Sequence, residues 1–128
     1  MSALVVDTSV WVEFFRGEAL PRLEEALQNG LVVLAPIVAA ELLSAPLSKA
    51  ERHVLVDFVN DLPLHPTPLA HWQGVGALRA ELSKKGLSVS TPDAHVAACA
   101  LEAKAELWSR DAIFRKVGRV SRLQLFEP

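Results

Sequence analysis

The sequence contains only one cysteine, Cys99, among its 128 residues. A single thiol permits neither an intrachain disulfide nor a multi-cysteine zinc site, and a reducing compartment is the simplest setting for it. A long apolar segment is also lacking, because the longest nearly apolar run, residues 31–40, is interrupted by Pro36 and falls short of the roughly 20 residues of a membrane-spanning helix. The N-terminus lacks the basic segment of a signal peptide. We therefore expect a cytoplasmic protein with no membrane contact.

An excess of positive charge is absent as well. The formal net charge is −2 and the isoelectric point is about 6.1, which argues against nucleic-acid binding through bulk positive charge. The charge is nevertheless uneven, because residues 1–61 contain nine acids and four bases, whereas residues 62–128 contain six acids and nine bases. The C-terminal half is therefore the electropositive half.

The composition predicts one folded domain spanning residues 1–128. Hydrophobic residues make up 51% of the chain and charged residues 22%, a balance that excludes intrinsic disorder. Short apolar runs predict strands at 4–6, 31–34, 62–65, 106–108 and 123–126. Helical spacing predicts helices at 8–15, 21–28, 36–44, 48–59, 68–85, 91–104 and 113–117, the first of them capped by Thr8 or Ser9. This alternation is typical of an α/β sandwich with a mainly parallel sheet.

Three aspartates occupy positions where such a sheet places its chemistry. Asp7 directly follows the first predicted strand, and Asp111 comes shortly after the strand at 106–108. Ligands of open parallel sheets bind beyond the carboxyl ends of the strands, although helix N-capping would also explain an aspartate at either position. Asp93 lies in the first turn of a predicted helix, where an acid complements the helix dipole, but it also heads the apolar stripe that should face the sheet.

Glu41 is harder to explain without a function. It lies among Ile37, Val38, Leu42 and Leu43, so the helical spacing predicts that it lies on or beside a buried face. Burying an unpaired carboxylate costs several kcal/mol, and such groups persist when they are paired, protonated or bound to metal.

The four acids together predict an acidic pocket at the strand ends. Crowded carboxylates repel one another and raise some of their pKa values, and a divalent cation relieves that repulsion. Ligation by oxygen alone favours Mg²⁺ or Mn²⁺ over zinc. Because such ions activate water for attack on phosphorus, the predicted chemistry is metal-dependent phosphodiester hydrolysis.

The contexts of these acids resemble those of the PIN-domain family, and most of all its VapC-type toxins. The resemblance covers the whole chain in order and spacing. It is carried by four segments, VVDTSVW at 5–11, AAELL at 39–43, PDAHVAA at 92–98 and SRD at 109–111.

The resemblance implies a three-layer α/β/α sandwich and an Mg²⁺- or Mn²⁺-dependent endoribonuclease that cleaves RNA with metal-activated water. It further implies a homodimer and inhibition by a cognate VapB-type antitoxin. By position, the family's four acidic site residues correspond to Asp7, Glu41, Asp93 and Asp111. Asp7 and Asp93 are expected to bind the metal directly, whereas Glu41 and Asp111 act through water or a second ion.

Two serines match small polar positions of the family beside the site, Ser9 and Ser109, and could hold a ligand carboxylate or a water molecule. Ser109 stands where threonine is common, a change that keeps the hydroxyl. Many relatives carry a further acid where this chain has Ile113, a difference that argues against a fully occupied second metal site.

Basic residues near the fourth acid could bind RNA phosphates, although a solvated basic surface explains each of them equally well. They are Arg110, Arg115, Lys116, Arg119 and Arg122. The four histidines, His53, His65, His71 and His95, show neither the spacing of a metal site nor a nucleophile partner, and we expect no catalytic role for them. The helical aromatics are expected mainly in the core, and any that remain exposed would mark a dimer or antitoxin surface. They are Trp11, Phe14, Phe15 and Trp72.

Three alternatives remain open at this point. One is an RNA-processing PIN nuclease without a toxin role. Another is an aspartyl-phosphate phosphotransferase using Asp7, although such enzymes need a second acid two residues on, where this chain has Ser9. The third is a non-catalytic RNA- or protein-binding module.

Overall fold

A short parallel sheet forms the centre of the molecule. The computed structural model describes residues 2–128 and contains β1 (Leu4–Val6), β2 (Val32–Val33) and β3 (Glu106–Trp108). β1 lies between β2 and β3 and pairs in parallel with both. All three residues of β1 are buried, as expected for the central strand of a sheet covered on both faces.

The two predicted edge strands are reduced to single bridges. Leu64 pairs with Leu34 beside β2, and Leu125 pairs with Leu107 beside β3, both in parallel. Pro63 and Pro66 flank the first bridge, and proline cannot donate to a β-ladder, so a longer strand does not form there. At each edge the sheet therefore gains a single bridge, whereas strands were predicted at 62–65 and 123–126.

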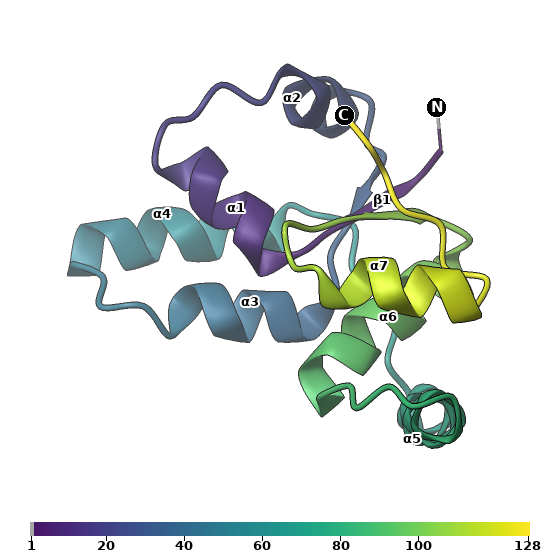
Figure 1. Cartoon of the computed structure of the whole chain (residues 1–128). Coiled ribbons are helices and arrows are strands. Elements are labelled where there is room, and N and C mark those ends of the chain that lie inside the picture. Colours follow the sequence, from purple (N-terminus) through teal and green to yellow (C-terminus); the bar gives the residue numbers. More distant parts are fainter. Residues whose placement is uncertain (1) are drawn as a thin grey trace.

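Helices connect and cover the strands at nearly the predicted positions. They are α1 (Thr8–Phe15), α2 (Pro21–Gln28), α3 (Pro36–Leu43), α4 (Lys49–Asn60), α5 (Leu69–Lys84), α6 (Thr91–Ala103) and α7 (Ile113–Val120). α2 lies on one side of β1, and α6, with α5 outside it, lies on the other (Figure 1). This arrangement confirms the predicted α/β/α sandwich with a parallel sheet.

The helix ends follow local chemistry, with one exception. Ser48 and Glu51 form a capping box at the start of α4, and Ser90 caps α6 by accepting a hydrogen bond from the backbone N–H of Asp93. The prediction that Thr8 or Ser9 caps α1 was wrong, because Asp7 is the N-cap residue of that helix and its side chain makes no capping hydrogen bond. The carboxylate of Asp7 instead accepts hydrogen bonds from the hydroxyls of Ser9 and Ser109.

The core contains buried residues of the sheet and of the helices on both of its sides. Every residue of α6 from Ala94 to Ala100 is buried, because this helix contacts β1 and β3 on one side and α5 on the other. Large side chains such as Trp11, Trp108 and Phe114 are also almost fully buried. Within residues 2–128, no helix has the length and apolar character needed to cross a membrane.

Candidate active site

Asp7 lies at the carboxyl end of the central strand, with 8% of its surface exposed. Its backbone N–H donates to the carbonyl oxygen of Trp108 at 2.9 Å, which holds the end of β1 against the end of β3. Its Oδ2 atom accepts hydrogen bonds from Ser9 Oγ at 3.0 Å and Ser109 Oγ at 2.7 Å. Since both bonds fall on one carboxylate oxygen, Oδ1 is available to a ligand.

The two serines join separate parts of the chain around this carboxylate. Ser9 Oγ accepts the backbone N–H of Arg110 at 3.0 Å, and Ser109 Oγ accepts the backbone N–H of Asp111 at 3.0 Å. Each hydroxyl therefore accepts a hydrogen bond from the loop after β3 and donates one to Asp7. The loop and the start of α1 are fixed together by these bonds.

Asp93 is a partly buried acid in the first turn of α6. Burial raises the pKa of its carboxyl above the usual value, although the Ser90 side chain opposes the rise, and the negative charges of Asp111 and Asp7 raise the pKa further. Asp7 and the loop that contains Asp111 lie together, because Ser109 is hydrogen-bonded to Asp7, and the charges of both acids act on Asp93. Their mutual repulsion is uncompensated, and a bound cation would relieve it.

Asp111 is exposed and takes part in a local turn. Its Oδ1 atom accepts the backbone N–H of Ile113 at 3.0 Å. Asp111 is not the N-cap residue of α7, because Ala112 occupies that position, so the helix-capping alternative considered for this aspartate does not apply. The carboxylate still faces solvent and can accept further ligands with its other oxygen.

The prediction that Glu41 lies on or beside a buried face was wrong. Glu41 is exposed on α3, because the buried face of this short helix is formed by Val38 and Leu42. Its Oε1 atom accepts a hydrogen bond from Thr8 Oγ1 at 2.7 Å. This bond connects α3 to the start of α1. Because Thr8 directly follows Asp7, Glu41 lies beside the candidate site.

The acidic residues form an open group and not a tight cluster. Among residues 2–128, no three of these carboxylates bring ligand atoms within 4.8 Å of one another. This group offers carboxylate and hydroxyl oxygens, which are the donors that Mg²⁺ and Mn²⁺ prefer, and it carries unbalanced negative charge. Its donor set therefore fits a hard divalent cation, with waters completing the coordination.

The basic residues near the site have different environments. Arg110 forms a bidentate ion pair with Glu13, with Nε–Oε2 and Nη2–Oε1 distances of 2.7 and 2.9 Å, and its guanidinium lies over the ring of Trp108. Arg115, Lys116 and Arg119 are exposed on α7, and across residues 2–128 they form no ion pair. Their charges thus face solvent.

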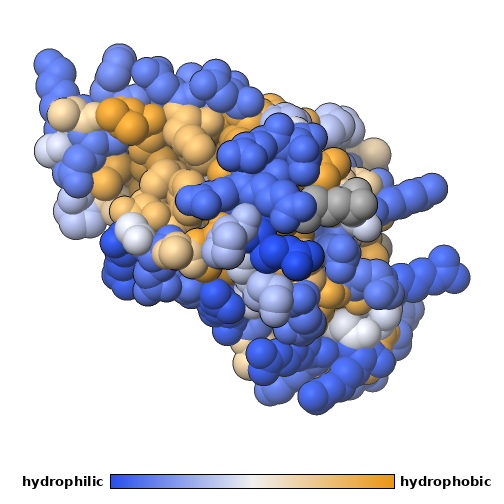
Figure 2. Space-filling view, turned by 90° about the horizontal axis from the view of Figure 1, so that it is seen from above, coloured by the Kyte–Doolittle hydropathy of each residue, from blue (hydrophilic) through white to orange (hydrophobic). Residues whose placement is uncertain are grey.

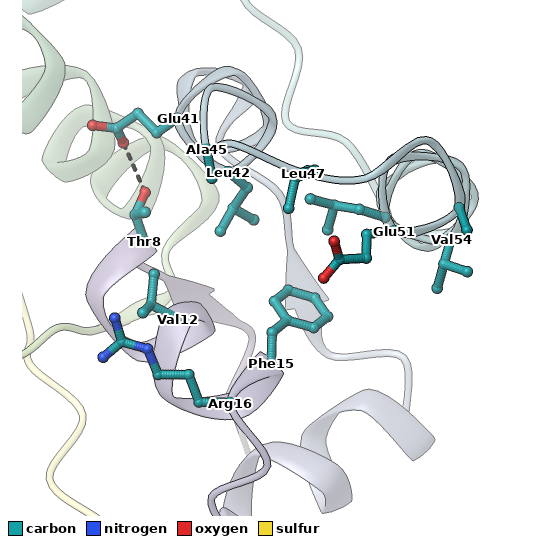
Figure 3. A pocket seen from close by; sticks show the side chains of 12 residues that line it. Thr8, Val12, Phe15, Arg16, Glu41, Leu42, Ala45, Leu47, Glu51 and Val54 are labelled. Atoms are coloured by element: carbon teal, nitrogen blue, oxygen red, sulfur yellow. Dashed lines mark hydrogen bonds between the residues drawn. The ribbon is translucent and has the colours of Figure 1, made fainter.

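An apolar groove of about 660 Å³ begins beside Glu41 and Thr8 and runs between α1, α3 and α4. Phe15, Leu47 and Val54 surround the open space, with the Thr8–Glu41 hydrogen bond at one end (Figure 3). Phe15 and Val54 are 45% and 67% exposed. An apolar area is visible at the left in Figure 2, on the side of α1 and α4 in Figure 1.

Three of the four histidines form a cluster that sequence reasoning missed. His65, His71 and His95 lie in a hydrogen-bonded chain with Glu102, and Cys99 lies beside His95. Burial lowers the pKa of His95 to about 4 and raises the pKa of Cys99 to about 12. The spacing along the chain gave only a partial signal, because His95, Cys99 and Glu102 share a face of α6, whereas His65 and His71 join them only through the packing of α5 on α6.

Comparison with known proteins agrees with this architecture. A sequence model of the PIN domain matches residues 4–120. VapC ribonuclease Mb1587 of Mycobacterium bovis and Ribonuclease VapC11 of Mycobacterium tuberculosis are each 30% identical over 131 residues, and each alignment covers 94% of this chain and 96% of the relative.

Solved structures share the fold at lower identity. VapBC2 from Rickettsia felis, bound to a DNA fragment from its promoter, matches with a TM-score of 0.76 and 22% identity over 97% of both chains. VapBC-5 from Mycobacterium tuberculosis matches with a TM-score of 0.71 and 23% identity over 100% of both chains. The chain therefore belongs to the PIN-domain family and, within it, to the VapC-type proteins.

Proposed function

We propose that this chain is a metal-dependent endoribonuclease and the toxin component of a VapBC-type toxin–antitoxin pair. The observation that carries the proposal is the buried carboxylate of Asp7 at the carboxyl end of β1, hydrogen-bonded to the loop that contains Asp111, with Asp93 within the electrostatic influence of both acids. The choice of RNA as substrate is supported by the relatives named VapC ribonucleases, which align with this chain over 96% of their length.

In this proposal Asp7 and Asp93 bind Mg²⁺ or Mn²⁺ directly, and Glu41 and Asp111 contribute through water or a second ion. The bound cation supplies positive charge that lowers the pKa of a water nucleophile and stabilises charge on the cleaved phosphate. Ser9 and Ser109 hold the Asp7 carboxylate in one orientation through its Oδ2 atom. The Asp7 carboxylate is thus in place before RNA arrives, which reduces the reorganisation needed for reaction.

RNA would approach this negative pocket through the basic surface next to it. Arg115, Lys116 and Arg119 on α7 carry charges that can attract phosphates, and Arg110 lies on the loop that contains Asp111. In this proposal the acids bind the cation at the reaction centre, and the bases bind phosphates of the RNA backbone on either side of it.

The catalytic assignment is tested by RNA cleavage with purified protein. Asp7→Asn and Asp93→Asn should each reduce the Mg²⁺- or Mn²⁺-dependent rate by about 100-fold or more, since even supporting groups of metal sites contribute roughly 10–100-fold. Asp57→Asn, at an exposed position of α4, is the matched control, and this variant should cleave RNA at the wild-type rate. Cleavage that persists in both site variants, or that is unaffected by a chelator, would reject the assignment.

The partner of the proposed toxin would be a VapB-type antitoxin bound in the apolar groove. Solved structures of VapBC pairs support the existence of such a partner. The groove presents Phe15 and Val54 to solvent and ends at Glu41, so an apolar helix lying in it would also cover the side of the candidate active site. Occupation of the groove would thus couple binding to inhibition.

A binding experiment separates this surface from other apolar positions. Val54→Asp should abolish binding of a VapB-type antitoxin while leaving RNA cleavage intact. Leu69→Asp, which alters a residue that is 72% exposed on α5 outside the groove, is the control and should bind normally. A toxin should arrest growth when it is expressed, and co-expression of the antitoxin should relieve the arrest, whereas an RNA-processing nuclease should not behave in this way.

The expected homodimer is tested separately by light scattering of the purified protein.

A further inference from the structure

Histidine, cysteine and glutamate side chains, the residue types that bind metal ions, gather between α5 and α6. The group consists of His65 before α5, His71 of α5, and three residues spaced along one face of α6, His95, Cys99 and Glu102. His65 is 8% exposed, His71 3%, and His95 and Cys99 are fully buried. Aliphatic side chains normally fill such helix contacts, so a buried group of imidazoles and a thiol calls for an explanation.

Two imidazole nitrogens of this group point at the same atom. His65 Nε2 lies 2.7 Å and His71 Nδ1 lies 2.8 Å from Glu102 Oε1. Cys99 closes the arrangement, because one ligand atom from each of His65, His71 and Cys99 lies within 4.8 Å of the others. Ligand atoms around tetrahedral Zn²⁺ lie roughly 3.3–3.8 Å apart for bonds of about 2.0–2.3 Å, so a small contraction is sufficient.

We propose that His65, His71 and Cys99 form a site for a transition-metal ion of the Zn²⁺ class, with the Glu102 carboxylate as fourth ligand. On binding, the thiol of Cys99 releases its proton to solvent. The protons with which His65 Nε2 and His71 Nδ1 donate to Glu102 move to the other nitrogen of each ring, so that both imidazoles present a lone pair to the ion and stay neutral. Glu102 exchanges its hydrogen bonds to the two imidazoles for a bond to the ion. Its side chain is 38% exposed, which provides the route by which the ion enters.

The donor set separates this site from the acidic pocket. Two imidazoles, one thiolate and one carboxylate suit a borderline ion with four ligands, whereas the pocket around Asp7 offers only oxygen atoms. Asp93 and Cys99 are both on α6, six residues apart, which is about 9 Å along a helix. The two sites are therefore distinct in position as well as in chemistry.

The surroundings of the site hold one of its ligands in place. His71 Nε2 lies 2.7 Å from His95 Nδ1, so the second ring nitrogen of His71 is bonded when the first faces the proposed ion. His95 in turn stacks on Trp72, with ring centroids 4.7 Å apart and an interplanar angle of 9°. Metal-ligating histidines commonly have a bonded second nitrogen, which fixes the direction of the ring.

The ion would join three parts of the fold. It would link the segment before α5 and α5 itself to α6, the helix at the centre of the core. An ion that binds the folded chain and not the unfolded chain raises the midpoint of thermal unfolding. The expected role is therefore structural.

Metal titration of the chelator-treated full chain tests the proposal. Co²⁺ should bind with one equivalent at this site and give near-ultraviolet absorption from thiolate-to-cobalt charge transfer, together with the visible bands of a tetrahedral site. Zn²⁺ should displace Co²⁺ and raise the melting temperature. Binding without thiolate absorption, or no binding at all, would overturn the proposal.

Two variants locate the site, because they remove ligands of different kinds. Cys99→Ala and His65→Gln should each weaken Zn²⁺ binding by about 100-fold or more, which exceeds the usual effect of a supporting residue. His53→Gln, at an exposed position of α4, is the control and should bind as the wild type does. Circular dichroism without metal verifies the fold of each variant, and wild-type affinity in either folded variant would contradict the assignment.

A third variant separates this site from the proposed nuclease site. The double variant Asp7→Asn/Asp93→Asn should retain Zn²⁺ binding and thiolate absorption, while Cys99→Ala should retain Mg²⁺-dependent RNA cleavage. If the double variant loses the Zn²⁺ site, the ion belongs to the acidic pocket and the proposal fails. Loss of RNA cleavage in the double variant alone bears only on the proposed nuclease function.

Discussion

Ser109 Oγ donates a 2.7 Å hydrogen bond to Asp7 Oδ2 and thereby joins two residues that are 102 positions apart in the sequence. The backbone reinforces this contact, because the N–H of Asp7 donates to the carbonyl of Trp108. The parallel pairing of β1 with β3 places both residues at one edge of the sheet. The orientation of the candidate ligand Asp7 thus depends on a loop from the other end of the chain.

Replacing this hydroxyl should reduce activity more than stability. Ser109→Ala removes the shorter bond to Asp7 and the acceptor for the backbone N–H of Asp111. We expect RNA cleavage to fall by roughly 10–100-fold and a higher metal concentration to be required, as for other groups that orient a metal ligand. Ser83→Ala, at an exposed position of α5, is the control, and equal rates for the two variants would contradict this role.

Asp93 should make the metal-free protein less stable as the pH rises. Burial raises its pKa in the folded state, and the charges of Asp111 and Asp7 raise it further, so the folded chain holds this proton more tightly than the unfolded chain. The free energy of unfolding should therefore fall as the pH rises through the interval between the unfolded and folded pKa values, and stay lower above it.

Asp93→Asn should remove this pH dependence. Because the side chain is partly exposed and screened by water, the gain in stability at neutral pH should be below about 1 kcal/mol. Adding Mg²⁺ should stabilise the wild type and have little effect on the variant. Urea unfolding at several pH values, with and without Mg²⁺, measures both effects, and a variant less stable than the wild type at neutral pH would refute the expected sign.

Much of this arrangement was predictable because the signals are local. The run ending at Asp7 predicted the central strand, Pro36 predicted the start of α3, and Ser48 with Lys49 predicted the start of α4. Proline and a capping serine act on neighbouring backbone groups, so their effect does not depend on the tertiary fold. The family resemblance likewise rested on short segments around four acids.

The features that escaped prediction depend on packing between distant segments. Glu41 was expected near a buried face, but α3 is short and apolar on nearly every side, so helical spacing could not identify its solvent-facing side. The cluster of His65, His71 and Cys99 forms only when α5 packs on α6. Sequence spacing carries no information about such a contact when the ligands come from separate elements.

The exposed position of Glu41 leads to a different expectation for its substitution. Glu41→Gln should change the free energy of unfolding by less than about 0.5 kcal/mol, as is usual at surface positions. If Glu41 contributes to the proposed site, cleavage should still fall by roughly tenfold or more. Glu24→Gln on exposed α2 provides the comparison, measured in the same unfolding and RNA cleavage assays. Full cleavage activity of Glu41→Gln would remove this residue from the site.

The ion pair between Arg110 and Glu13 should limit the attraction of RNA to the loop after β3. Both guanidinium contacts are short, and the hydrogen bond from Arg110 lowers the pKa of Glu13, so this carboxylate stays charged and occupies the guanidinium. Glu13→Gln removes the competing charge and makes Arg110 available to a phosphate. RNA affinity should rise, and the slope of log K against log salt should steepen by roughly 0.7, the value for one additional phosphate contact on a single strand.

This prediction is measured by fluorescence anisotropy of a labelled single-stranded RNA, using the Asp93→Asn background to prevent cleavage. Glu25→Gln is a matched control, because Glu25 faces Arg22 in an exposed pair on α2 and its removal changes the net charge equally. An equal change of slope in both variants would mean that net charge alone is responsible. A change confined to Glu13→Gln would show that Arg110 can contact a phosphate and that its ion pair with Glu13 opposes this contact.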